Sequence, residues 1–128
     1  LKNEKKRKKL FKLRLIKHQY YLKKIKLFNN NFLTINISDK NYQNFLDFPL
    51  LVKNKKKLNK FLLDNNIEVR YNHYYNCEKL FRKSIYCVNA ERYENDLICL
   101  PLHPKINFYY INYTINKINQ FYLKSKFH

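Results

Sequence analysis

The sequence predicts an α+β fold, in which a small mixed sheet of roughly three to four strands is covered by helices and preceded by a long N-terminal helix. Short segments of alternating apolar and polar residues are typical of strands, and longer segments with apolar residues three and four positions apart are typical of helices. Both kinds follow one another along 128 residues, without a Gly- or Ser-rich linker or an internal repeat. A chain of this length is expected to form one domain around one core.

The N-terminal segment is strongly basic and is predicted to form a long helix within residues 1–31. Residues 2–28 hold twelve Lys and Arg against Glu4 alone. The apolar residues on one face of this helix are Phe11, Leu15, Leu22 and Ile25. Two interpretations stay open: a basic arm that binds nucleic acid or anionic lipid, or a helix whose apolar stripe packs on the rest of the domain.

Two strands are predicted next. The Asn residues at 29–31 end the helix, and residues 33–37 alternate apolar and polar as in an edge strand. After a polar loop at 39–44, residues 46–52 alternate again. Pro49 lies within this second strand and has no N–H to donate to a ladder, which favours an edge strand or a strand start.

The middle of the chain predicts a helix, a strand and a short helix. Asn54 can cap a helix with an apolar face. That helix ends at residues 64–66, where Asn takes the place of Gly as the residue able to adopt positive φ, because the chain contains no Gly. Residues 67–72 alternate as in a strand, and Asn89 can cap a short helix that ends at Asp96.

The segment LICLPLHP, residues 97–104, is predicted to be the central strand of the sheet. Its apolar run is too short for a helix, which needs about 10 to 12 residues, and it ends at two prolines. A closing amphipathic helix follows. Its apolar stripe consists of Phe108, Ile111, Ile115, Ile118 and Tyr122.

The residue types argue against several kinds of catalytic site. The nine acidic residues are scattered, the four His show no metal-ligand spacing, and a chain without Gly cannot form a Gly-rich phosphate loop. The cysteines Cys77, Cys87 and Cys99 lack a CxxC spacing, which predicts reduced thiols in a cytoplasmic protein and no metal site. A pair formed by Cys77 and His73 has no specific spacing, so we expect no catalytic residue in the chain.

The net charge of +18 would suit a polyanionic partner. A composition rich in Lys, Asn and Ile is also what an AT-rich gene produces, so the charge alone is a weak sign of nucleic-acid binding. A small basic nucleic-acid-binding module and a decayed remnant without activity both stay open as alternatives. No stretch reaches the roughly 18 apolar residues of a membrane span, and we expect no membrane partner.

Four segments together resemble the C-terminal domain of the DegT/DnrJ/StrS family of sugar aminotransferases, which depend on pyridoxal phosphate (PLP). They are FPLLV (48–52) with the helix after it, IEVR (67–70), NAERYENDLICLPLHP (89–104) and the closing helix. The basic first helix stands where the family has a long helix. His103 matches the His of the family's LPxHP motif. The simpler interpretation of His103 is a turn residue after the strand, without a role in binding.

The resemblance implies one domain, residues 1–128, made of the basic helix (1–31) and an α+β domain (32–128) like the C-terminal domain of a fold-type I aminotransferase. In the family, a separate N-terminal domain carries the Schiff-base lysine and most contacts to PLP. Because the chain starts at Leu1 and has no such domain, we expect a fragment of a longer chain that binds no PLP alone. The expected partners are an N-terminal aminotransferase domain or a second copy, and a nucleotide-sugar substrate; binding to nucleic acid would be non-specific.

The resemblance also implies candidates for the substrate cleft, at and after the IEVR segment. Arg70 matches the Arg of the family's motif. Tyr71 stands where many members have Pro, and Cys77 stands where many have His. His73 and Tyr74 occupy variable, often aromatic positions.

Overall fold

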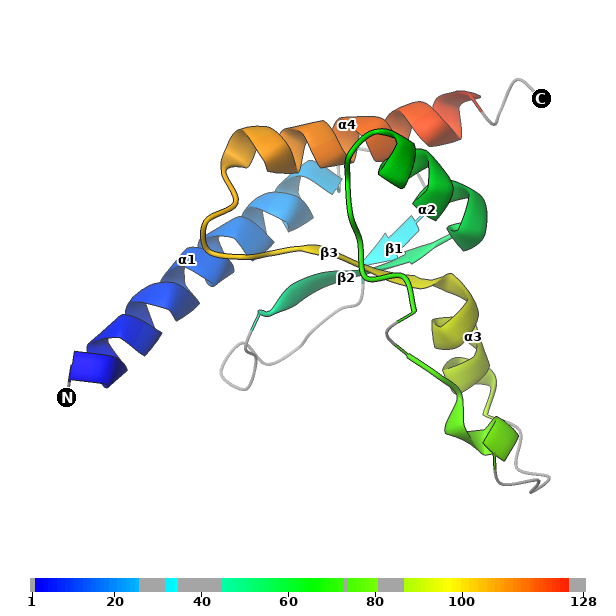
Figure 1. Ribbon diagram of the computed structural model, residues 1–128, viewed down its shortest axis with the longest axis horizontal. Coiled ribbons are helices and arrows are strands. Elements are labelled where there is room, and N and C mark those ends of the chain that lie inside the picture. The colour runs from blue at the N-terminus through cyan, green and yellow to red at the C-terminus, as the bar shows by residue number, and fades with distance from the viewer. Residues whose placement is uncertain (1, 26–31, 35–44, 73, 81–86, 125–128) are drawn as a thin grey trace.

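The computed structural model describes residues 2–25, 32–34, 45–72, 74–80 and 87–124 (Figure 1). Its elements are, in order, α1 (Lys2–Ile25), β1 (Phe32–Thr34), β2 (Asp47–Val52), α2 (Lys55–Asp64), the short 3-10 helix η2 (Cys77–Leu80), α3 (Val88–Asp96), β3 (Leu97–Pro101) and α4 (Phe108–Lys124). The prediction of a mixed helix-and-strand fold is confirmed. The predicted strand residues 35–37 lie outside the described residues.

The described strands pair in the order β1-β2-β3, and both pairings are antiparallel. The predicted mixture of strand directions is therefore wrong for this part of the chain, and so is the central position expected for residues 97–104. Periodicity marks a strand but gives neither its direction nor its neighbours. The middle strand is β2, although it contains Pro49. The described β1 pairs only with residues 50–52, so Pro49 faces no described partner on that side.

The strand predicted at residues 67–72 forms only an isolated bridge between Arg70 and Cys99 of β3. The two residues exchange backbone hydrogen bonds of 3.1 Å in both directions. The alternation itself is retained, because Ile67 and Val69 are buried while Glu68 and Arg70 are exposed. An extended segment that crosses a sheet edge shows the same period as a strand, and only its hydrogen bonds separate the two cases.

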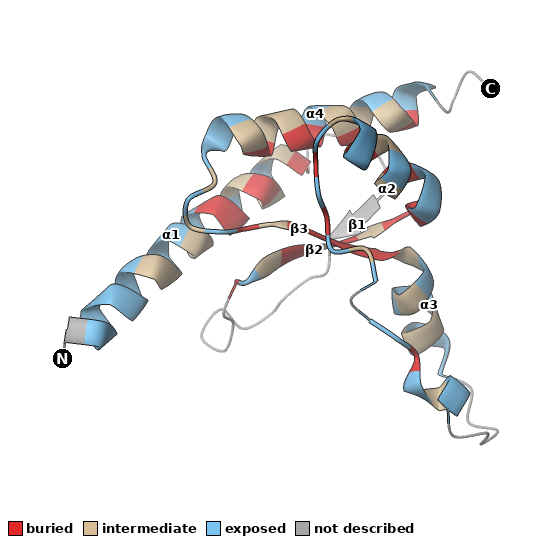
Figure 2. Cartoon of the chain, in the orientation of Figure 1, coloured by how far each residue is buried: buried red, intermediate tan, exposed pale blue. Residues whose placement is uncertain are grey.

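One face of the sheet carries the core (Figure 2). Phe48 lies opposite Leu100 and Leu50 lies opposite Ile98, and all four side chains are buried. These side chains form one cluster with buried residues of the helices that cover them: Tyr21 and Ile25 of α1, Leu58 and Leu62 of α2, and Ile111, Ile115, Ile118 and Tyr122 of α4. The stripe predicted on the closing helix is thus confirmed except at Phe108, which is exposed.

The C-terminal half of α1 packs into this core. The Tyr21 ring stacks on Phe48 with centroids 4.8 Å apart, and its hydroxyl donates to the Pro101 carbonyl oxygen over 3.1 Å. The first turns of α1 project from the body and are exposed (Figures 1 and 2). The packing interpretation is therefore confirmed for the predicted stripe, because Ile25 belongs to the core and Phe11, Leu15 and Leu22 pack against it. The basic turns before Phe11 project from the body.

Of the three helix ends for which an Asn was predicted to play a role, one is confirmed and two differ. Asn66 has a φ of 58° after α2, which confirms that Asn replaces Gly there. Asn54 also has positive φ (56°), and its side chain makes no capping bond, so the predicted side-chain cap is wrong. The helix α3 begins one residue before Asn89, and the backbone N–H of Cys87 at its start donates to the Glu78 carboxylate over 2.9 Å. The pattern of the helix itself cannot reveal this partner, which lies nine residues before Cys87 at the helix start.

No helix within the described ranges combines the length and the apolar character that crossing a bilayer requires.

Candidate functional site

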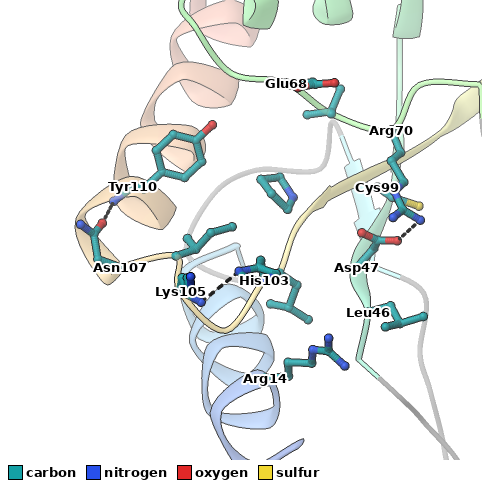
Figure 3. Close-up of a pocket in the computed structure, with 14 residues that line it drawn as sticks. Arg14, Leu46, Asp47, Glu68, Arg70, Cys99, His103, Lys105, Asn107 and Tyr110 are labelled. Atoms are coloured by element: carbon teal, nitrogen blue, oxygen red, sulfur yellow. Dashed lines mark hydrogen bonds and ion pairs between the residues drawn. The ribbon is translucent and has the colours of Figure 1, made fainter. Parts of the chain in front are cut away.

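A pocket of about 670 Å³ opens between α1, the start of β2, the end of β3 and the first turn of α4 (Figure 3). Polar side chains from separate parts of the chain line it, among them Arg14, Asp47, Arg70, His103, Lys105 and Tyr110. Residues far apart in sequence therefore meet at this place.

Arg70 and Asp47 form an ion pair on the wall of the pocket, with 3.0 Å between Nη1 and Oδ2. The bridge to Cys99 and the pairing of Asp47 with Pro101 bring both residues to the same stretch of β3. The Arg70 side chain is 57% exposed and that of Asp47 is 18% exposed, so the Arg70 guanidinium can meet a ligand while it stays paired.

Cys99 lies under this ion pair and is buried. Burial raises the pKa of the Cys99 thiol to about 11, and the nearby Asp47 charge contributes to the rise. The thiol is therefore protonated at neutral pH and does not serve as a nucleophile, since the thiolate is the reactive form.

The turn after β3 is held by α1. Lys17 Nζ donates to the carbonyl oxygens of His103 (3.4 Å) and of Pro104. Within the turn, His103 Nδ1 accepts a hydrogen bond from the Lys105 N–H over 3.2 Å. Asn107 Oδ1 then accepts from the Tyr110 N–H over 2.8 Å, which caps α4. His103 is thus a turn residue, as its simpler interpretation predicts, and it also lines the pocket.

Arg14 reaches the same pocket from α1. Its Nε atom is buried, and no described residue accepts a hydrogen bond from it. No carboxylate of the described residues pairs with its guanidinium. A buried donor of a charged group without an acceptor carries a desolvation cost, and its burial keeps this atom out of reach of a molecule in the pocket.

Of the cleft candidates inferred from the sequence, Arg70 lines the pocket. Tyr71 instead lies under Lys55, with Nζ 4.8 Å from the ring centroid. Tyr74 is 52% exposed, and Cys77 is exposed at the start of η2; neither lines the pocket. His73 lies outside the described residues.

Within the described residues, two lysine side chains are buried. The two buried lysines both donate to backbone carbonyl oxygens: Lys17 to the turn after β3, and Lys55 to Glu94 over 2.7 Å. Among the described residues, no three His, Cys, Asp or Glu side chains gather as a metal site would require.

Comparison with known proteins gives matches only at the level of structure. No family model matches the sequence, and no curated protein matches it. The fold superposes on the aminotransferase TlmJ from Streptoalloteichus hindustanus with a TM-score of 0.75 at 12% identity, over 86% of this chain and 31% of that one. For a DegT DnrJ EryC1 StrS aminotransferase from Brucella abortus the TM-score is 0.74 at 14% identity, over 88% and 31%.

A third match is PseC from Helicobacter pylori, an aminotransferase involved in the biosynthesis of pseudoaminic acid, with a TM-score of 0.68 at 20% identity. This chain has the DegT/DnrJ/EryC1/StrS aminotransferase fold. The resemblance inferred from the sequence is thereby confirmed for the fold. The match covers 85% of this chain and 32% of PseC, so the chain spans about a third of the length of an aminotransferase of this type.

Most of the pocket was not predictable as a site in this aminotransferase fold. Lys105 and Asn107 could have been suspected, because they follow the LPLHP segment directly. Arg14 and Asp47 carry no such signal: one is a basic residue among many on α1, and the other is a polar residue in an alternating strand. Tertiary structure alone places them beside the turn.

Proposed function

We propose that this chain is the C-terminal portion of a PLP-dependent nucleotide-sugar aminotransferase and forms part of its substrate cleft. The observation that carries the proposal is the fold shared with sugar aminotransferases over 86% of this chain but only 31% of theirs. The cytoplasm and polysaccharide biosynthesis are the setting that such a reaction implies.

In this proposal the chain contributes shape and polar contacts rather than bond chemistry. Arg70, exposed and paired with Asp47, binds a polar group of the substrate. Lys17 fixes the turn that carries His103 and so holds the pocket open. Tyr71, Tyr74, Cys77 and His73 are proposed to border the same cleft beyond the pocket. In this proposal the lysine that carries the cofactor lies on another segment or subunit, because in the family a separate N-terminal domain carries it.

The test begins with the chain alone. Purified protein mixed with PLP, a keto nucleotide sugar and an amino donor should give no amino sugar and no absorbance typical of a PLP–lysine adduct. Transamination by the chain alone would contradict the proposal. The positive arm isolates the native polypeptide from its source with an antibody to this chain. A PLP-binding polypeptide should then be continuous with the chain or bound to it.

The role of Arg70 is tested in that native assembly. Arg70→Gln should raise KM for the nucleotide sugar about tenfold, because a charge-assisted hydrogen bond contributes about 1.5 to 3 kcal/mol. Arg92→Gln removes the same charge from α3 outside the pocket and should leave KM unchanged. Equal effects of the two substitutions would refute a contact by Arg70.

A second candidate function is non-specific nucleic-acid binding, which the projecting basic half of α1 favours. It predicts an affinity for single-stranded RNA or DNA whose logarithm falls linearly with log salt concentration, by about 0.7 to 0.9 per phosphate contacted. Replacing Lys5, Lys6, Lys8 and Lys9 with Gln should abolish that dependence. An unchanged salt dependence of the affinity in this variant would show that the N-terminal half of α1 does not bind the nucleic acid.

A further inference from the structure

We propose that the outer face of α1, the face turned away from the core, is a docking surface for a membrane rich in anionic lipids. This inference goes beyond the proposed function and does not rest on it, because the side chains that carry it do not line the pocket. The expectation of no membrane partner concerned a membrane span, whereas a helix that lies on a bilayer surface needs none.

Apolar side chains form a second stripe on α1, apart from the stripe that packs on the core. Leu13, Ile16 and Tyr20 follow one another at spacings of three and four residues, so they lie on one face of the helix. We call them the outer stripe. Leu13 is 36% exposed and Ile16 is 52% exposed, whereas the residues of the core-facing stripe are half-buried or buried.

The first turn of α4 continues the outer stripe. The Tyr20 ring meets the Phe108 ring edge-on with centroids 4.8 Å apart, and the Tyr20 hydroxyl donates to Asn112 Oδ1 over 2.9 Å. Phe108 is 43% exposed, although the sequence predicts it in the apolar stripe of α4. It extends the apolar surface of α1 instead of the core. The exposed apolar surface therefore spans two helices that these contacts hold together (Figure 1).

Lysines surround the outer stripe. Lys9 and Lys12 are exposed, and each lies four residues before a member of the stripe. Lys24 lies four residues after Tyr20, with Nζ 5.6 Å from the centroid of that ring. The one acidic residue of α1, Glu4, is paired with a lysine one turn along the helix at 3.0 Å. Positive charge around an exposed apolar stripe is the pattern of a helix that binds the surface of an anionic bilayer.

The combination of charge and apolar surface favours a bilayer over two other partners. A second copy bound through this face would bring lysines against lysines, and like charges across an interface repel. A nucleic acid would pair with the lysines, but aliphatic side chains offer no π-face to a base, so Leu13 and Ile16 would stay in water. A bilayer uses both features, because its head groups attract the lysines and its acyl boundary takes up the apolar side chains.

The test uses the whole chain with a tryptophan reporter, since the chain contains no Trp of its own. Ile16→Trp places the reporter in the outer stripe. Leu63→Trp places it on α2 at a site of nearly equal exposure, 51%. With vesicles of phosphatidylcholine and phosphatidylglycerol, the emission of Ile16→Trp alone should shift to the blue and be quenched by brominated acyl chains. A shift in both variants, or in neither, would overturn the inference.

Sedimentation with the same vesicles measures the affinity. Ile16→Gln should weaken binding about fivefold or more, because it removes an aliphatic group from the contact, whereas Leu63→Gln should change it less than about twofold. Lys12→Gln should weaken binding about fivefold, the usual effect of one lysine at an anionic surface. The matched control Lys57→Gln, exposed on α2, should have less than about a twofold effect. Equal losses for the substitutions on α1 and on α2 would indicate attraction by bulk charge and refute a docking surface.

Two further results decide between the bilayer and its alternatives. Vesicles of phosphatidylcholine alone should bind about tenfold more weakly or worse, and equal binding would contradict the role of the lysines. Binding of a single-stranded RNA oligonucleotide that is unaffected by Ile16→Gln, together with no sedimentation on anionic vesicles, would assign this face to nucleic acid and overturn the inference. Far-UV circular dichroism of each variant verifies that the fold is intact.

Discussion

Truncation of Tyr21 should remove much of this domain's margin of stability. The side chain is fully buried, its ring stacks on Phe48, and its hydroxyl donates to the Pro101 carbonyl oxygen. Replacing a buried aromatic residue with Ala costs about 3 to 5 kcal/mol. A domain of this size is stable by about 5 to 15 kcal/mol in total. Tyr21→Ala should therefore remove a large share of the free energy of unfolding.

Tyr21→Phe separates the two contributions, because it keeps the ring and removes only the hydroxyl. We expect a loss of about 1 kcal/mol, the usual net value of a hydrogen bond. Tyr109→Ala is the control, since this tyrosine is 77% exposed on α4 and should change stability by less than about 0.5 kcal/mol.

Urea unfolding followed by far-UV circular dichroism and by tyrosine fluorescence measures all three variants. Coincident transitions of the two probes would justify a two-state fit. If Tyr21→Ala unfolded at the same urea concentration as Tyr109→Ala, α1 would not be packed on the sheet. The position of Arg14 in the pocket would then fail with it.

The same residue predicts a dependence on alkaline pH. Burial raises the pKa of Tyr21 above its usual 10.0, so the folded state keeps the phenol proton that the unfolded state loses. The contribution to stability is complete below about pH 10 and is lost as the pH rises above it. Tyr21→Phe should show a smaller loss of stability between pH 9 and pH 11, on the order of a few tenths to 1 kcal/mol.

Three further outcomes follow from other buried or paired groups. Burial lowers the pKa of His18 below 6.5, so stability present above that pH should fall as the pH drops through it, and His18→Gln should flatten this acid limb in urea titrations. Cys77 and Cys87 are exposed, whereas Cys99 is buried and has a raised pKa. A thiol reagent at pH 8 should therefore modify Cys77 and Cys87 rapidly and Cys99 only on unfolding. Equal rates for all three cysteines would contradict the packing of β3. Arg70→Gln should cost less than about 1 kcal/mol of stability because the ion pair is partly exposed, and a larger loss would mean that Arg70 is structural.

The local sequence predicted those elements whose own residues carry a clear pattern. The strand at residues 97–101 and the helix α4 were recognisable because a buried strand and an amphipathic helix each carry a distinct period of apolar residues. The positive φ at Asn66 was predictable for the same local reason, since few residue types other than Gly tolerate it. The order of these segments was enough to indicate the aminotransferase fold.

The order of the strands and the assembly of the pocket were decided only by the tertiary structure. Periodicity gives the buried side of a segment but not its partner, so β2 could lie in the middle of the sheet despite Pro49, and residues 67–72 could be reduced to one bridge. Arg14 meets the turn after β3 because Lys17 and Tyr21, farther along α1, are fixed by carbonyl oxygens of residues 80 or more positions away. Such contacts depend on how whole faces pack, and no short window of sequence contains both partners.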